Sequence, residues 1–163
     1  MSESAQQISV LFVCLGNICR SPTAEGVFRR LVRQRGQEHA YRIDSCGTGA
    51  YHIGEPPDRR AREEAQRRGL SLDELRARGL EQHDFERFDY LVAMDEANYR
   101  DLKAAAPQGF HGHIVKLLDF AADHRGASVP DPYYGGDDGF SKVFAMVEQG
   151  CQGLIEHIEA AQR

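Results

Sequence analysis

Four short runs of strand length alternate with longer polar and mixed segments along the chain. Residues 8–13, 90–94 and 114–118 are mostly apolar, whereas apolar and charged side chains alternate in residues 41–44, a candidate for the second strand. Strands that alternate with helices usually form a parallel sheet covered by helices. The pattern therefore predicts an α/β fold, in which a four-stranded parallel sheet is flanked by helices on both faces.

Helices are expected between and after these runs, over residues 21–36, 58–69, 95–106 and 140–158. Ser21 is the expected N-cap of the first helix, because a proline follows it at the first helical position. Asp58 and Asp95 are the expected N-caps of the second and third helices. In parallel α/β sheets, ligands bind at the carboxyl ends of the strands. The loops after the first and fourth strands are therefore the candidate functional segments.

Length and charge narrow the possible functions. No internal repeat or linker interrupts the 163 residues, so we expect a single domain over residues 1–163. The formal net charge of -5 argues against nucleic acid or an anionic membrane as the main partner. The polar N-terminus does not resemble a signal peptide, and no apolar run is long enough to cross a bilayer. We therefore expect a cytoplasmic protein that does not insert into membranes.

The four cysteines are Cys14, Cys19, Cys46 and Cys151. Their spacing does not match a zinc site, so no metal is expected. We interpret Cys46 and Cys151 as small buried hydrophobic residues. A reactive cysteine is more plausible near the end of the first strand.

The segment 14–21, with the sequence CLGNICRS, follows the first strand directly and leads into the first helix. Backbone N–H groups in such a loop can surround an anion at the N-terminus of the helix. Gly16 and Asn17 tolerate the left-handed backbone angles that a tight loop requires. The segment is therefore a candidate phosphate-binding loop.

Three side chains of this loop suit phosphoryl transfer. Cys14 is the candidate nucleophile, because a helix N-terminus and a nearby arginine favour the reactive thiolate form. Arg20 can bind two phosphate oxygens at once through its planar guanidinium group. Ser21 can donate its hydroxyl to the thiolate.

A proton donor is expected in the loop after the fourth strand, where the sequence reads DPYY from Asp131. The Asp131 carboxyl group can protonate a departing phenolate and afterwards activate water. Tyr133 and Tyr134 can form the wall of a slot for a flat aromatic ring.

These motifs resemble the low-molecular-weight protein tyrosine phosphatases. Residues 13–22, VCLGNICRSP, match the phosphate loop of that family, and the DPYY segment matches its general-acid loop. The resemblance extends over the whole chain. It implies phosphotyrosine-containing protein substrates, a phosphocysteine intermediate, and neither a metal nor a cofactor. We expect a monomer.

The resemblance also implies roles for individual residues. Cys14 is the nucleophile, Arg20 binds the transferring phosphoryl group, and Asp131 is the general acid and then the base. Asn17 and Ser45 brace the loop. The residues expected to bind phosphate are Leu15, Gly16, Asn17, Ile18, Cys19 and Ser21. The residues expected to form the substrate wall are Leu15, Ile18, Tyr51, Tyr133 and Tyr134.

The sequence departs from the family pattern near Leu75. Many animal members carry a supporting histidine in the segment 75–78, and this chain does not. Which residue supports the outer side of the phosphate loop is therefore an open question. His52 and Glu55 lie beside the expected wall and are candidates for tuning peptide preference.

Two other functions fit the sequence less well than a phosphatase does. An arsenate reductase shares this fold and loop, but it needs a downstream pair of cysteines, and residues 82–89 contain none. A catalytically inactive phosphotyrosine-binding module needs no nucleophile, yet Cys14, Arg20 and Asp131 occur together. The role of Cys19 stays open between packing beneath the loop and forming a disulfide with oxidised Cys14.

Overall fold

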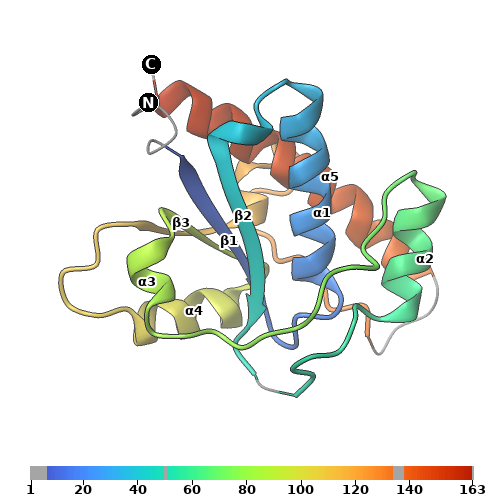
Figure 1. Ribbon diagram of the computed structural model, residues 1–163, viewed down its shortest axis with the longest axis horizontal. Coiled ribbons are helices and arrows are strands. Elements are labelled where there is room, and N and C mark those ends of the chain that lie inside the picture. The colour runs from blue at the N-terminus through green and yellow to red at the C-terminus, as the bar shows by residue number, and fades with distance from the viewer. Residues whose placement is uncertain (1–6, 50, 134–137, 163) are drawn as a thin grey trace.

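The sheet contains four parallel strands, as predicted (Figure 1). The computed structural model describes residues 7–49, 51–133 and 138–162. The strands are β1 (Ile8–Cys14), β2 (Tyr41–Gly47), β3 (Tyr90–Ala93) and β4 (His113–Lys116). Their order in the sheet is β2-β1-β3-β4.

Helices cover both faces of the sheet, which confirms the predicted architecture (Figure 1). The described α-helices are α1 (Arg20–Gln34), α2 (Arg59–Arg67), α3 (Asp84–Arg87), α4 (Glu96–Ala105) and α5 (Asp138–Ala161). Two short 3₁₀ helices, η2 (Glu38–Ala40) and η3 (Leu117–Phe120), complete the described helical elements. Helices α1 and α5 pack together on one face, and α3 and α4 lie on the other. Helix α2 packs against α5.

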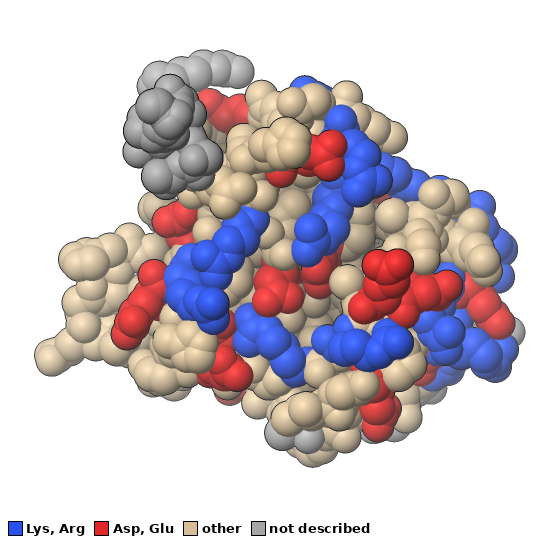
Figure 2. Space-filling view, in the orientation of Figure 1, with Lys and Arg blue, Asp and Glu red and all other residues tan. Residues whose placement is uncertain are grey.

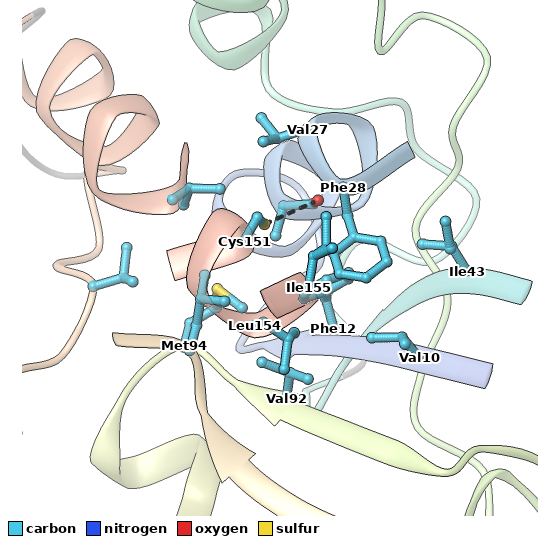
Figure 3. Close-up of a cluster of buried hydrophobic side chains, with 14 of the residues drawn as sticks. Val10, Phe12, Val27, Phe28, Ile43, Val92, Met94, Cys151, Leu154 and Ile155 are labelled. Carbon is cyan, nitrogen blue, oxygen red and sulfur yellow. Dashed lines mark hydrogen bonds between the residues drawn. The ribbon is translucent and has the colours of Figure 1, made fainter. Parts of the chain in front are cut away.

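The pleat of β1 divides its side chains between two buried clusters. Val10, Phe12 and Cys14 belong to the larger cluster, which β1 forms with α1 and α5 (Figure 3). The Phe12 ring lies 5.5 Å from the ring of Phe28 on α1. Leu11 and Val13 belong to the smaller cluster on the face of α3 and α4. Because both faces are covered, the strand is continuously apolar from Val10 to Cys14.

The predicted elements are present, but several of their boundaries differ; β2, for example, continues to Gly47 rather than ending at residue 44. The helices that begin after Asp58 and Asp95 are capped by those side chains, each at 2.8 Å from a backbone N–H. However, Ser21 is not the N-cap of α1, because the helix begins at Arg20 and Cys19 occupies the cap position. The predicted strand over residues 114–118 is also only partly a strand, because η3 begins at Leu117.

The order of the strands positions the loop that follows β1. Strand β1 lies between β2 and β3, and the chain proceeds first to one neighbour and later to the other. Such a switch point opens a crevice at the carboxyl ends of the strands. The segment after Cys14 lies at this crevice. No helix within the described part of the chain is long and apolar enough to span a membrane.

Candidate active site

The Cys14 sulfur is surrounded by hydrogen-bond donors. Cys14 is the last residue of β1, and its Sγ atom lies 3.0 Å from the Ser21 hydroxyl. The backbone N–H of Asn17 donates to the same sulfur at 3.3 Å. The Ser21 oxygen accepts a hydrogen bond from Asn17 Nδ2 at 2.8 Å, and its hydroxyl can donate either to the sulfur at 3.0 Å or to the Cys46 carbonyl at 3.4 Å. The Ser21 hydroxyl and the Asn17 N–H therefore both lie within donating distance of the candidate nucleophile.

Asn17 fixes the shape of the loop. Among the described residues other than glycine, it alone adopts a positive φ, 59°. Its Nδ2 donates to Ser21 Oγ at 2.8 Å and to Ser45 Oγ at 3.0 Å, and its Oδ1 accepts from the Arg78 N–H at 3.0 Å. The predicted bracing roles of Asn17 and Ser45 agree with this geometry. Gly16 does not need a left-handed angle. A side chain there would instead meet His52, at 3.0 Å.

Behind Ser45 lies a buried carboxylate that the sequence analysis missed. Ser45 donates its hydroxyl to Glu25 Oε1 at 2.7 Å, and Arg29 holds the other carboxylate oxygen at 2.8 Å. Burial raises the pKa of Glu25, although the hydrogen bonds from Arg29 and Ser45 oppose this effect. Because Glu25 accepts from Ser45, the serine oxygen is left to accept from Asn17. The direction of the whole chain of hydrogen bonds is thereby set.

The open question of the outer support of the loop is answered by Arg78. Its backbone N–H bonds to Asn17, while its side chain pairs with the fully buried Asp84 at 3.0 Å and with Asp44 at 3.1 Å. The segment is also joined to the end of β2, because the Gly47 N–H donates to the Arg78 carbonyl at 2.9 Å. Leu75, near the position of the family histidine, packs against the main core instead.

Gly47 allows β2 and the phosphate loop to approach closely. A Cβ atom at this position would lie 2.6 Å from the carbonyl oxygen of Leu15 and 3.1 Å from the N–H nitrogen of Asn17. These neighbours are backbone atoms, which cannot rotate away. A larger residue at Gly47 would therefore displace the loop.

Arg20 is almost fully buried, with 2% of its surface exposed, and it points toward acidic groups. Its Nη1 donates to Asp95 Oδ2 at 2.6 Å and to the Val129 carbonyl at 3.1 Å. Its Nη2 lies 3.5 Å from Asp131 Oδ2. Burial acts to lower the pKa of Arg20, but Cys14 and Asp95 outweigh it and raise the pKa, so the guanidinium stays charged. From the sequence, Asp95 is predicted only as a helix cap, yet it also binds Arg20.

A cavity of about 390 Å³ brings the two predicted loops together. Asp131 and Cys14 both line it, and the Tyr133 N–H holds Asp131 Oδ1 at 3.1 Å. The complete lining is Cys14, Leu15, Gly16, Ile18, Cys19, Arg20, Tyr51, His52, Asp131 and Tyr133. Asn17 and Ser21 lie behind the sulfur rather than in the lining. Tyr134 lies outside the described residues.

The rim of the cavity is apolar and accessible. Tyr51 is 70% exposed and Tyr133 is 37% exposed, so both residues are accessible to a ligand. His52 lies between these two rings, with centroids at 6.5 and 6.3 Å, and its Nδ1 is 3.0 Å from Glu55. His52 therefore lies close to Tyr51 and Tyr133, and an effect of His52 and Glu55 on peptide preference stays a prediction.

The remaining cysteines differ in their surroundings. Cys46 and Cys151 are fully buried, as interpreted from the sequence. Cys19 touches the cavity but also packs with Ile18 and Phe140. Burial raises the pKa of the Cys19 thiol well above its usual range, and Asp58 adds to this effect. Its thiol is therefore protonated at neutral pH.

Positive charge on the face seen in Figure 2 is accompanied by negative charge. Lys and Arg side chains lie there among Asp and Glu side chains rather than forming one continuous basic surface. The hydrogen-bond donors at the Cys14 sulfur and the buried Arg20 are thus local features of a protein whose net charge is negative. In the described part of the chain, no three His, Cys, Asp or Glu side chains are placed to share a metal ion.

Comparison with known proteins identifies the family. The family model described as "Low molecular weight phosphotyrosine protein phosphatase" matches residues 9–163. The chain belongs to this family. It is therefore a phosphatase, a hydrolase, and the resemblance noted in its motifs is confirmed.

Individual relatives of this phosphatase are similar over nearly their whole length. A low molecular weight protein-tyrosine-phosphatase of Bacillus subtilis is 45% identical over 152 residues, covering 93% of this chain and 96% of the relative. The human low molecular weight phosphotyrosine protein phosphatase is 41% identical over 157 residues, covering 96% and 98%. A solved protein tyrosine phosphatase from Entamoeba histolytica superposes with a TM-score of 0.91 at 39% identity, covering 96% and 100%.

The same fold also serves a phosphatase with a different named substrate. The solved Drosophila arginine phosphatase superposes with a TM-score of 0.85 at 29% identity, covering 91% of this chain and 96% of that one. The fold alone therefore does not determine the substrate class of this phosphatase, which depends on the residues of its own cavity.

Proposed function

We propose that this phosphatase hydrolyses phosphotyrosine in protein substrates through a phosphocysteine intermediate. The observation that carries the proposal is the convergence of Cys14, Arg20 and Asp131 on one cavity. A nucleophile, an anion-binding group and a proton donor are what phosphoryl transfer from a phenol requires. Tyr51 and Tyr133 offer apolar surface to a flat ring, which supports an aromatic substrate.

In the first step, the Cys14 thiolate attacks phosphorus, and an S–P bond forms as the bond to the phenolic oxygen breaks. Arg20 and the loop N–H groups bind the three non-bridging oxygens. Asp131, in its acid form, gives its proton to the leaving oxygen, so tyrosine departs as a neutral phenol. Because phosphate oxygens compete with Asp131 for Arg20, substrate binding releases this carboxyl group to face the leaving oxygen.

In the second step, the Asp131 carboxylate takes a proton from water as the water oxygen attacks phosphorus. The S–P bond breaks, inorganic phosphate leaves, and the thiolate is restored with the Ser21 hydroxyl beside it. The protons pass only among Asp131, water and the leaving oxygen, so the scheme calls for no cofactor or metal. It needs a reduced Cys14, which suits the cytoplasmic location that we also propose. We further propose that the enzyme is a monomer.

The central test is the hydrolysis of p-nitrophenyl phosphate, which releases a yellow product. Cys14→Ser is expected to reduce turnover to the background rate while binding of inorganic phosphate persists, because Arg20 and the loop backbone remain. A chelator is expected to leave the wild-type rate unchanged. Turnover by Cys14→Ser above background would contradict the phosphocysteine intermediate, and strong inhibition by the chelator would reveal a metal.

The substrate class is tested with three substrates at equal concentration. A phosphotyrosine peptide is expected to be hydrolysed faster than the same peptide with phosphoarginine, because a phenolic leaving group suits the aromatic rim. Reduction of arsenate is not expected. Faster hydrolysis of phosphoarginine would redefine the substrate, and thiol-dependent arsenate reduction would support the alternative reductase.

A further inference from the structure

Asp131 is held in place through its neighbour Tyr133. The Tyr133 N–H donates to Asp131 Oδ1 at 3.1 Å, while about a third of the Asp131 side chain is exposed to solvent. A general acid must lie within hydrogen-bond reach of the leaving oxygen. Whatever fixes Tyr133 therefore also fixes the position of the proton donor.

Arg60, in the first turn of α2, contacts Tyr133 in two ways. Its Nη2 donates to the Tyr133 carbonyl at 3.1 Å, and its guanidinium carbon lies 5.5 Å from the centre of the Tyr133 ring. The same guanidinium lies 4.7 Å from the centre of the Phe140 ring on α5. A flat cation between two aromatic rings is a favourable arrangement that lysine does not reproduce.

The other side of Arg60 is joined to the phosphate loop through Asp58. Arg60 Nε and Nη2 each donate to one oxygen of the Asp58 carboxylate at 3.1 Å. The Asp58 N–H donates to the Ile18 carbonyl in the phosphate loop at 2.8 Å. Burial acts to raise the pKa of Asp58, but the hydrogen bonds from Arg60 outweigh it and the pKa is lowered, so the carboxylate stays charged.

These contacts form one continuous path from the phosphate loop to the general acid. It runs from Ile18 to Asp58, then to Arg60, Tyr133 and Asp131. We propose that Arg60 is a positioning residue that holds the Asp131 loop in register with the phosphate loop. The inference rests on the proposed role of Asp131. Arg60 itself is not among the described residues that line the cavity, so it acts through Tyr133.

The test is a series of aryl phosphates whose phenols differ in acidity, assayed with Arg60→Met. We expect kcat to fall about 10- to 100-fold for phenyl phosphate, which depends on protonation of the leaving oxygen. The loss should be only about two- to threefold for a phosphate of a strongly acidic phenol. The dissociation constant of inorganic phosphate should change less than about twofold, because the phosphate loop is intact.

Two further variants separate positioning from a general loss of structure. Arg59→Gln is the matched control, because Arg59 is the neighbouring residue, is exposed, and pairs with Glu63 on the same helix. It should behave as the wild type throughout the series. Arg60→Lys keeps the charge but loses the planar fork, and it should give a smaller loss with the same dependence on the leaving group.

A double variant decides whether Arg60 acts through Asp131. In the Asp131→Ala background, Arg60→Met should cause no further loss, because the group that it positions is gone. The inference is overturned if Arg60→Met lowers kcat equally in the wild-type and Asp131→Ala backgrounds. It is also overturned if Arg60→Met and Arg60→Lys lower kcat equally for all leaving groups, or if they do not lower kcat at all. If Asp131→Ala alone shows no dependence on the leaving group, the proposed role of Asp131 fails instead.

Discussion

The phosphate loop and the Asp131 loop meet at one cavity, but they are held there differently. Asn17 and Ser21 in the phosphate loop are buried and bonded to each other, to β2 and to the Arg78 segment. Asp131 and Tyr133 are partly exposed, and side chains from outside their loop hold them. The anion-binding half is thus built into the core, whereas the proton-transferring half is attached to it. Substitutions in the two loops should therefore alter different kinetic constants.

The largest effect that separates the halves is expected for Asp131→Ala. Turnover of phenolic substrates should fall by about 10²–10⁴-fold, the usual contribution of general acid catalysis. The loss should shrink as the leaving phenol becomes more acidic, and phosphate binding should persist. Steady-state kinetics over a series of aryl phosphates measures both. An equal loss for good and poor leaving groups would assign Asp131 a structural role.

Asn17→Ala should affect the anion-binding half, by lowering both the stability of the protein and its affinity for phosphate. The substitution leaves Ser45 and the Arg78 N–H without their buried partner, at a cost of about 2–4 kcal/mol in the free energy of unfolding. It also places alanine at φ 59°, an unfavourable backbone angle. Urea unfolding and phosphate titration provide the measurements.

Asn17→Gly is the control for that experiment, since glycine accepts the left-handed angle but makes no side-chain hydrogen bonds. It should lose nearly as much stability as Asn17→Ala. If glycine instead restores wild-type stability and phosphate binding, the backbone angle matters and the hydrogen bonds of Asn17 do not.

How far the sequence allowed these features to be predicted depends on the distance between the residues involved. The strands, the phosphate loop and the caps at Asp58 and Asp95 could be predicted, because each signal lies within a few neighbouring residues. The prediction of Ser21 as an N-cap was wrong, because its hydroxyl bonds to Cys14 and Asn17 instead. A propensity scale cannot include that competing contact.

The unpredicted parts of the site come from remote segments. Arg78 supports Asn17 from 61 positions away, and Asp95 bonds Arg20 from 75 positions away. Glu25 was missed for a different reason, since a glutamate on a helix is usually exposed. Only the packing of α1 against β2 shows that its carboxylate is buried beside Ser45.

A smaller effect is expected from the redox chemistry of the phosphate loop. Peroxide should inactivate the enzyme by oxidising Cys14 to a sulfenic acid, which can condense with the Cys19 thiol to a disulfide and water. A dithiol should then restore activity. Recovery is compared between wild type and Cys19→Ser after identical exposure. Equal recovery would leave Cys19 with packing alone, the role favoured by its burial and raised pKa.

The smallest effect is expected at the exposed rim. Tyr51→Ala removes one side of the wall, so KM for a phosphotyrosine peptide should rise by about three- to tenfold, as for one aromatic contact. The kcat value should be unchanged, because Tyr51 takes no part in the proposed proton and phosphoryl transfers. A fall in kcat with constant KM would instead place Tyr51 in the chemical step.

The alternation of side chains along β1 has a consequence for insertions and deletions. Cys14 faces the α1 side of the sheet because it lies an even number of residues after Val10 and Phe12. One residue added or removed between Phe12 and Cys14 would turn the thiol toward the α4 side, unless the strand bulged. The sulfur would then point away from Ser21 and Arg20, although every residue of the motif was still present. The length of this strand is therefore as much a requirement of the active site as the identity of the nucleophile.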